Sequence, residues 1–353
     1  MKKSLRLWGL ATLASLLLAA CGGGGDGDQS PKLKYSALVS FGDSFSDVGT
    51  YAVSAIAQVG GGKYNVNGPN GKNWTELLAK QMAVTAPCAA QTGLNSVIPG
   101  IPAVAPSNHA GCTSYAQGGA RVTHPVGPGN INTYPADPSG ALGQLTDPVL
   151  NQINRHLTAA GGSFKGDELV TVLAGGNDVF MNLGAVSAQL QTPAQAVTAM
   201  GLAGAELAAY VKNLIVAKGA KFVVVVNLPD VSKTPFAYTL DAPTQGLIQT
   251  LSSTFNAQLA AGLSGVDVLL VDAYSQSIDQ AAHPAQYGIS NGSKPACDLA
   301  KTIFASSLVC TETTLIAGDV STYQFADGVH PTPYGYQLFA QFVTSQLLAK
   351  GWL

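Results

Sequence analysis

Four consecutive valines, Val223–Val226, constrain the fold of this chain more than any other feature of its sequence. They lie in an apolar run over 221–227, and further runs of strand length occur at 35–41, 168–173 and 266–271. β-Branched residues favour strands, and a strand that is apolar at every position has to be covered on both faces. Continuous apolar runs of this kind indicate a parallel sheet inside an α/β protein.

Helical patterns separate these runs along the chain. We predict helices over 73–83 with Asn73 as the N-cap, and then over 145–160, 192–218, 243–263 and 333–350. Pro193 suits the first helical position of the third helix, and Gly219 suits the position after its last turn. The alternation predicts a three-layer α/β/α sandwich with a mainly parallel sheet, built as a single domain over 35–353.

Two segments between these elements look irregular, 84–142 and 284–325, and each holds one pair of cysteines. Long loops of this kind are usually functional, so we expect 84–142 to shape a substrate cleft. With Cys21 set aside, the four cysteines suit two disulfides in an oxidising compartment.

The sequence allows three pairings of these cysteines, and we favour Cys88–Cys112 and Cys297–Cys310 because they close short loops. The alternative to two disulfides is that the four thiols bind zinc. No C-x-x-C pair and no histidine at ligand spacing supports it, so we expect no metal site.

Charge and composition exclude several classes of function. Charged residues make up 11% of the chain, against about 25% in ordinary soluble domains. The formal net charge is −2, so the chain has no basic field that would attract nucleic acid. The 46% of apolar residues excludes a disordered chain. We expect a large core, no nucleic-acid partner and a monomer.

Residues 1–20 have the pattern of an export signal. Three basic residues among the first six precede an apolar stretch over 7–20 that is too short to span a bilayer comfortably. The segment closes with Leu18-Ala19-Ala20-Cys21, which resembles the lipobox of bacterial lipoproteins. In that class the cysteine is acylated and becomes the mature N-terminus.

The lipobox resemblance implies a protein of the bacterial cell envelope, an outer-membrane lipoprotein held at the membrane by lipid on Cys21. The glycine-rich residues 21–34 would then be a flexible tether. The alternative is an ordinary signal peptide in which Cys21 is incidental. No later apolar run reaches the roughly 18 residues of a membrane-spanning helix.

Polar residues follow several of the predicted strands. They therefore lie at the carboxyl ends of the strands, where open α/β proteins have their ligand-binding and active sites. Ser44 comes just after the first strand, and we expect it at a helix start, where the dipole favours a developing anion; helix capping is the simpler alternative. Asn177 follows the second strand as a turn residue or as an amide donor. Gly118 and Gly119 lie between Ser44 and Asn177 in the sequence, and a pair of glycines can expose a backbone N–H to a ligand.

Asp327 precedes His330 by three residues, just before the last predicted helix. A carboxylate at this spacing can hold the imidazole Nδ1 and leave Nε2 free to act as a base. The alternative makes Asp327 the N-cap of the last helix. The remaining histidines have no such carboxylate in range; they are His109, His124, His156 and His283.

These four segments, in this order, resemble the motifs of the GDSL family of serine hydrolases, also called SGNH hydrolases, and the resemblance runs from about residue 37 to 345. It implies a serine esterase or lipase that needs no cofactor and cleaves carboxylic esters of small molecules or lipids through an acyl-enzyme. By resemblance, Ser44 is the nucleophile, and His330 is the base that Asp327 orients. The N–H groups of Ser44 and Gly119 and the amide of Asn177 would form the oxyanion hole.

Two details of the sequence complicate this resemblance. Ser114 stands where the family usually has asparagine, which leaves the choice between Gly119 and Gly118 open. Residues 288–292 match the G-x-S-x-G pattern of a nucleophile elbow, but no apolar strand precedes them and no helix follows, so we predict a loop.

Two other functions stay open, an acyltransferase that uses the same acyl-enzyme and a non-catalytic binding lipoprotein of the same fold. Some relatives carry a C-terminal outer-membrane barrel, and because the sequence ends at Leu353, soon after His330, we expect no such domain.

Overall fold

Within residues 33–353, the part of the chain that the computed structural model describes, the main sheet has four parallel strands in the order β1–β4–β5–β6. The predictions for residues 1–20, for Cys21 and for most of the tether lie outside this range. The strands all fall on predicted apolar runs; they are β1 (Leu38–Gly42), β4 (Leu169–Leu173), β5 (Phe222–Val226) and β6 (Leu269–Val271). Val170 pairs with Val223 in the parallel register, which joins the first half of the sheet to the second.

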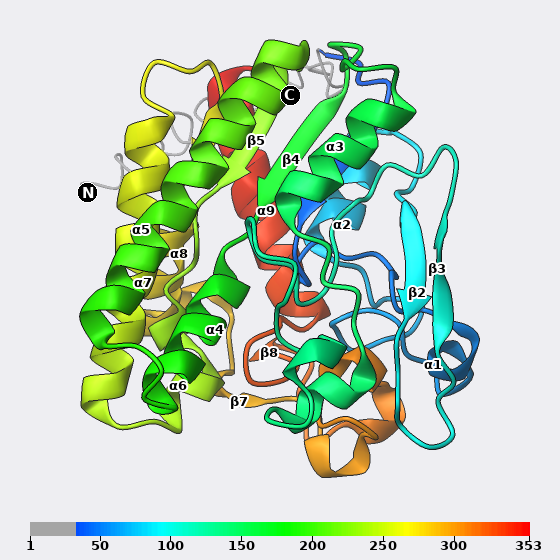
Figure 1. Ribbon diagram of the computed structural model, residues 1–353, viewed down its shortest axis with the longest axis vertical. Helices are drawn as coiled ribbons and strands as arrows, with labels where there is room; N and C mark the ends of the chain where they lie inside the picture. Colours follow the sequence, from blue (N-terminus) through cyan, green and yellow to red (C-terminus); the bar gives the residue numbers. More distant parts are fainter. Residues whose placement is uncertain (1–32) are drawn as a thin grey trace, which may run out of the picture. The chain divides into compact units, whose positions relative to one another are not determined.

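Helices cover both faces of this sheet, which confirms the three-layer α/β/α architecture. Val223 and Val225 point into a core shared with α3 (Val149–Ala159), α5 (Pro193–Tyr210) and α7 (Ala242–Gly262). Val224 and Val226 point into a core shared with α2 (Trp74–Gln81) and α9 (Pro333–Lys350). This alternation explains why all four valines are needed, since successive side chains of a strand face opposite layers. Figure 1 shows α3 and α5 in front of the sheet and α9 behind it.

The predicted helices are present with small changes at their ends. Asn73 caps α2 in a capping box with Glu76, and Thr192 caps α5 with Pro193 at its first position. A π turn over 211–215 and a 3-10 turn over 216–218 extend α5 to Gly219, whose φ is 101°. The bounds are α2 (Trp74–Gln81), α3 (Val149–Ala159), α5 (Pro193–Tyr210), α7 (Ala242–Gly262) and α9 (Pro333–Lys350).

Several elements were not predicted from the sequence. They are the helices α1 (Ser54–Gln58), α4 (Gly176–Ser187), α6 (Pro235–Tyr238) and α8 (Ala273–Ala282). The two segments expected to be irregular also contain strands. One holds the antiparallel pair β2 (Gln91–Leu94) and β3 (Val104–Asn108), and the other holds the parallel pair β7 (Asn291–Pro295) and β8 (Tyr323–Phe325). Glycine, proline and polar residues dominate β2, β3 and β7, and β8 is only three residues long, so none of them shows the sustained alternation that marks a strand in sequence.

Each of these two segments is closed by a disulfide. The structure pairs Cys88 with Cys112 and Cys297 with Cys310, the pairing that the sequence favoured. Among the described residues, Pro193–Lys218 is long and apolar enough to cross a membrane by length and composition, so the expectation that no later run reaches that length was wrong. Met200 and Leu207 of this stretch are fully buried in the core with α7, as in the core helix of a globular domain.

Candidate active site

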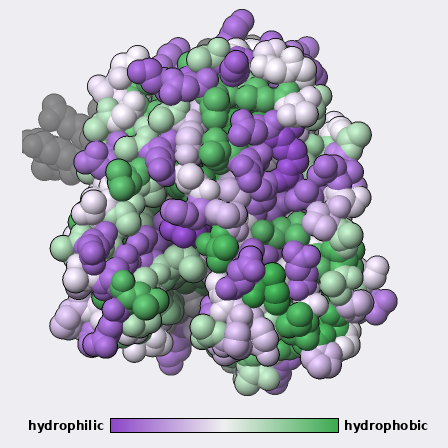
Figure 2. Space-filling view, viewed as in Figure 1, coloured by the Kyte–Doolittle hydropathy of each residue, from purple (hydrophilic) through white to green (hydrophobic). Residues whose placement is uncertain are grey.

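A cleft of about 720 Å³ lies at the carboxyl ends of β1 and β4. Ser44, Gly119, Asn177, Asp327 and His330, which are far apart in the sequence, all line this cleft. Figure 2 shows a hollow in the lower half of this face, with apolar side chains gathered beside it. The structure therefore brings the polar groups singled out in the sequence to one site.

Ser44 lies in a tight turn and not at the start of a helix, so the expected help from a helix dipole was wrong. The turn is held by Asp43, whose backbone oxygen accepts the N–H of Ser46 and whose Oδ1 accepts the N–H of Phe45. Gly42 begins the turn with a φ of 150°, and a Cβ there would lie 2.0 Å from the oxygen of Leu173. Only glycine therefore lets the end of β1 lie this close to the end of β4, two residues before Ser44.

The hydroxyl of Ser44 is hydrogen-bonded to His330, with 2.8 Å between Oγ and Nε2. On the other side of the imidazole, Nδ1 lies 2.8 Å from Oδ2 of Asp327 and 2.9 Å from Oδ1. The N-cap of α9 is Thr332, so the alternative in which Asp327 caps the last helix was wrong.

Three backbone N–H groups also donate to the Asp327 carboxylate. Val329 and His330 donate to Oδ1 at 2.9 and 2.8 Å, and Ser307 donates to Oδ2 at 3.0 Å. Burial raises the pKa of this carboxyl, but the nearby charge of His330 and the hydrogen bonds from its ring and its backbone N–H outweigh burial and hold the pKa below its usual range. Asp327 is therefore ionised at neutral pH.

An aromatic ring that the sequence did not single out packs against the imidazole. The ring centre of Tyr64 lies 4.6 Å from that of His330, with an angle of 31° between the planes. The hydroxyl of Tyr64 donates to Oε1 of Gln144 at 2.7 Å, which fixes the ring. Tyr64 comes from a glycine-rich loop with no local signal of a functional residue, so sequence reasoning missed it.

The glycine pair beside Ser44 is oriented by Asp47. The N–H of Gly118 donates to Oδ2 of Asp47 at 2.9 Å, and Oδ1 of Asp47 accepts the N–H groups of Gly49 and Thr50. The N–H of Gly118 is therefore occupied, whereas Gly119, with a φ of 76°, lines the cleft. This geometry distinguishes the two glycines that the sequence left open.

Asn177 is the second residue of α4 and not a turn residue, which corrects the simpler expectation for it. Its Nδ2 donates to the backbone oxygen of Ala120 at 2.8 Å. The next residue, Asp178, accepts hydrogen bonds from Arg121 Nε at 2.9 Å and from the N–H of Val122 at 3.0 Å. The segment that carries Gly119 is thus bound to the first turn of α4, a link that sequence reasoning missed.

Asp43, the neighbour of Ser44, is a second carboxyl at the cleft. Burial raises its pKa to about 7, although the hydrogen bond from the N–H of Phe45 and the charge of His330 act in the opposite direction. Sequence reasoning assigned no role to this residue.

The remaining histidines and the second serine motif lie apart from the cleft lining. The expectation that no other histidine has a carboxylate in range was wrong, because Nδ1 of His283 lies 2.8 Å from Oδ1 of Asp279. Ser290 accepts a hydrogen bond from Thr322, and residues 288–290 form a loop as predicted, but the prediction of a loop was wrong for Asn291 and Gly292, which begin β7. Residues 33–353 contain no group of three or more His, Cys, Asp or Glu that suits a metal ion.

Comparisons with known proteins agree with the resemblance seen in the motifs. The family described as "GDSL-like Lipase/Acylhydrolase" matches residues 38–343. A Pseudomonas putida protein described as "Uncharacterized protein in trpE-trpG intergenic region" is 30% identical over 348 residues, which cover 96% of this chain and 52% of that protein. Esterase EstA of Pseudomonas aeruginosa is 34% identical over 139 residues, which cover 38% of this chain and 20% of EstA.

The chain therefore spans about half the length of the first of these relatives, and its match to the second covers a fifth of that protein. Among solved structures, the extracellular lipase from Streptomyces rimosus matches with a TM-score of 0.38 and 16% identity, over 88% of this chain and 99% of the lipase.

Proposed function

The chain belongs to the GDSL-like lipase/acylhydrolase family, and from this premise we propose that it is a serine esterase or lipase that hydrolyses acyl esters through Ser44. The observation that carries the proposal is the unbroken line of hydrogen bonds from Ser44 through His330 to Asp327. A nucleophile, a base and a group that orients the base, each within hydrogen-bond distance of the next, form the constellation that acyl transfer needs.

Three donors near Ser44 support a proposed oxyanion hole. The N–H groups of Ser44 and Gly119 donate to no other described residue, and both residues line the cleft. The amide of Asn177 uses one of its two hydrogens on Ala120, which leaves the other for a ligand. Donors that are fixed before the reaction stabilise the charge that develops on the carbonyl oxygen.

The proposed reaction has two symmetrical halves. Ser44 Oγ attacks the ester carbonyl carbon and passes its proton to Nε2 of His330, while the carbonyl oxygen becomes the oxyanion. The bond to the alcohol oxygen then breaks, and the departing alcohol takes the proton from Nε2. Water repeats the sequence on the acyl-enzyme, which releases the carboxylic acid and returns the proton to Ser44.

The cleft walls favour an ester with an apolar acyl part. The lining includes apolar side chains from the sheet edge and the segments after it, namely Leu173, Phe180, Leu228, Val231 and Phe236. The two cysteine-containing segments add further apolar side chains, namely Ile98, Leu142, Leu299, Ile303 and Phe304. We therefore propose carboxylic esters of small molecules or lipids as the substrate class.

We propose in addition that the protein is exported to the bacterial cell envelope and anchored there by lipid on Cys21. The two disulfides support export, because such bonds persist in oxidising compartments. We expect Cys21→Ala to give soluble, unacylated protein that keeps its esterase activity. Membrane retention of that variant contradicts the anchor.

Hydrolysis of a chromogenic ester by matched serine variants tests the proposed activity. We expect Ser44→Ala and His330→Ala to abolish turnover. The first removes the nucleophile that attacks the carbonyl carbon, and the second removes the base that transfers the proton. Ser290→Ala is the control, since Ser290 lies in the second serine motif. Turnover that survives in folded Ser44→Ala protein contradicts the proposal, and a wild-type protein that binds the ester without cleaving it indicates a binding protein.

A further inference from the structure

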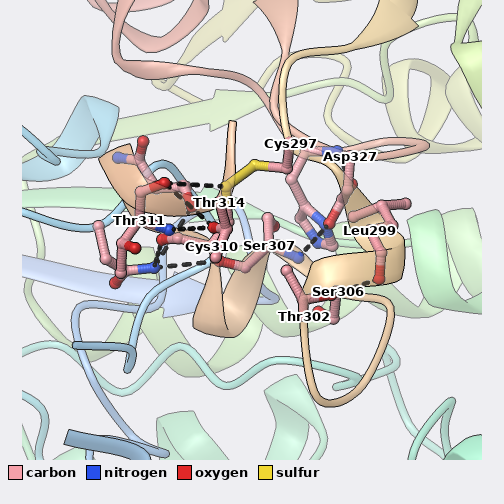
Figure 3. The surroundings of a disulfide bond; sticks show 12 residues. Cys297, Leu299, Thr302, Ser306, Ser307, Cys310, Thr311, Thr314 and Asp327 are labelled. Carbon is pink, nitrogen blue, oxygen red and sulfur yellow. Dashed lines mark hydrogen bonds and ion pairs between the residues drawn. A yellow bond between two sulfur atoms is a disulfide. The ribbon is translucent and has the colours of Figure 1, made fainter. Parts of the chain in front are cut away.

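A loop that the Cys297–Cys310 disulfide closes reaches the carboxylate of Asp327 from outside its own turn. The N–H groups on Oδ1 come from the turn of Asp327 itself, whereas Oδ2 accepts the N–H of Ser307 from this loop at 3.0 Å. Figure 3 shows Ser307 beside Cys310 of the disulfide, and Asp327 beside Cys297. The two oxygens of Asp327 therefore accept backbone hydrogen bonds from two different parts of the chain, Oδ1 from its own turn and Oδ2 from the disulfide loop.

The disulfide joins this loop to the segment that carries Asp327. The N–H of Cys297 donates to the oxygen of Ala326, the residue before Asp327, at 2.9 Å. Cys297, Cys310 and Ala326 pack together in one buried apolar cluster. The N–H of Cys310 in turn donates to the oxygen of Ser307 at 3.1 Å. The bridge therefore fixes the position of Ser307 relative to Asp327.

Asn67 holds the same turn from another part of the chain. Its Nδ2 lies 3.0 Å from the oxygen of Ser307 and 3.0 Å from that of Cys310, and its backbone N–H donates to Cys310 at 2.8 Å. Asn67 is buried, so these bonds are shielded from water. The hydrogen bonds from Asn67 fix the backbone oxygens of this turn, so that the N–H of Ser307 points at the carboxylate of Asp327.

We propose that Ser307 is a positioning residue for Asp327, acting through its backbone N–H, and that the Cys297–Cys310 bridge holds it in place and so raises turnover as well as stability. This inference rests on the proposed roles of Asp327 and His330. An N–H that donates to a charged carboxylate makes a strong and directional bond. It stops the carboxylate from rotating away from Nδ1 of His330, the atom whose proton it has to hold during catalysis.

The same loop forms part of the cleft wall, through Leu299, Ile303 and Phe304. Loss of the bridge therefore has two expected effects, a lower kcat from a looser Asp327 and a higher KM from a looser wall. Loss of the Ser307 N–H alone has only the first. This difference separates positioning from general support of the fold.

Two variants of Ser307 isolate its N–H. Ser307→Pro removes the donor at the first position of a 3-10 turn, where proline is tolerated, and Ser306 before it is extended (φ −135°, ψ 147°), as proline requires. Ser307→Ala keeps the N–H and removes a hydroxyl that has no hydrogen-bond partner among the described residues. Neither variant has the hydroxyl, and only the proline variant lacks the N–H.

We expect kcat for a chromogenic ester to be about 10-fold lower in Ser307→Pro than in Ser307→Ala, with the same KM, because one bond to a charged acceptor is lost. The low-field proton resonance of His330 Nδ1 should move in the proline variant only. Equal kcat and an unmoved resonance in two folded variants overturn the inference. Loss of turnover in Ser44→Ala tests the proposed function separately.

If Ser307→Pro does not fold, separate removal of the two disulfides provides a second test of the inference. We expect the Cys297→Ser/Cys310→Ser protein to lose kcat and gain KM at a temperature where it is folded. The Cys88→Ser/Cys112→Ser protein is the control, since it also loses a bridge but not the support of Asp327. Equal kcat in the two double variants overturns the inference.

Discussion

Replacement of Asp327 by asparagine removes a charge and keeps the shape of the side chain. The carboxylate accepts hydrogen bonds from His330 Nδ1 and from the N–H groups of Val329, His330 and Ser307, all between 2.8 and 3.0 Å. Asparagine offers these donors one oxygen and an NH₂ group that accepts nothing. At least one buried N–H therefore faces another donor in the variant.

This mismatch sets the size of the expected effects. A buried donor without a partner costs about 1–3 kcal/mol of folding free energy. In the well-studied serine-protease triad the same change lowers turnover about 10⁴-fold. Here we expect about 10²–10³-fold, because the proposed oxyanion donors retain part of the catalysis. His330→Ala should lower turnover further, since both proton transfers are lost.

The pH dependence of the unfolding free energy is a second, independent test of the ionised state of Asp327. The folded-state pKa of Asp327 lies below its ordinary value of 3.8. The ionised carboxylate therefore contributes stability that is present above about pH 4 and is lost as the pH falls further. The difference in unfolding free energy between wild type and Asp327→Asn should accordingly be largest near neutral pH and shrink below pH 4.

Turnover of a chromogenic ester and the melting temperature are to be measured on the same Asp327→Asn sample. We expect turnover to fall by the stated factor and the melting temperature to fall by a few degrees. Near-normal turnover with a lowered melting temperature refutes the reasoning. It would mean that the carboxylate only supports the fold and that another group orients His330.

Three further predictions concern other groups at the cleft. Asn177→Ala should lower kcat about 10²–10³-fold, because one oxyanion donor is lost; an unchanged kcat contradicts that role. Tyr64→Leu should lower kcat while Tyr64→Phe keeps the ring against His330 and most of the activity, and equal kcat values contradict a role for the ring. Burial raises the pKa of Asp43 from 3.8 to about 7, so wild-type unfolding free energy should fall as the pH rises from about 4 to 7. Asp43→Asn should reduce that slope, to which the buried carboxyls of Asp47 and Asp178 also contribute, and an equal slope in wild type and variant contradicts the burial effect.

Local signals explain which parts of the fold the sequence predicts. The valines at 223–226, the cap at Asn73 and Pro193 at a helix start act over a few residues, and the structure has the strand and the helices that they indicate. The start of α4 was missed because Gly175-Gly176-Asn177 has the composition of a turn, and no side chain caps the helix. Tertiary bonds from Asp178 and Asn177 to the neighbouring segment hold that first turn instead.

The same distinction applies to the candidate site. Ser44, Asp327 and His330 lie in short motifs, and the roles expected for them came from the resemblance of those motifs to a family, because the spacing alone left helix capping as an alternative for Ser44 and for Asp327. Tyr64 and Ser307 come from loops that reach His330 and Asp327 only in the folded chain. Nothing in their local sequence records these contacts, since bonds between distant segments leave no periodic pattern in a single chain.

Covalent labelling of the wild-type protein tests the central claim most directly. A serine-reactive fluorophosphonate probe modifies a hydroxyl that a neighbouring base has activated. After digestion and peptide mapping, we predict label on the peptide that contains Ser44 and loss of that label in His330→Ala. Label on Ser290, or no label on the folded protein, would contradict the account.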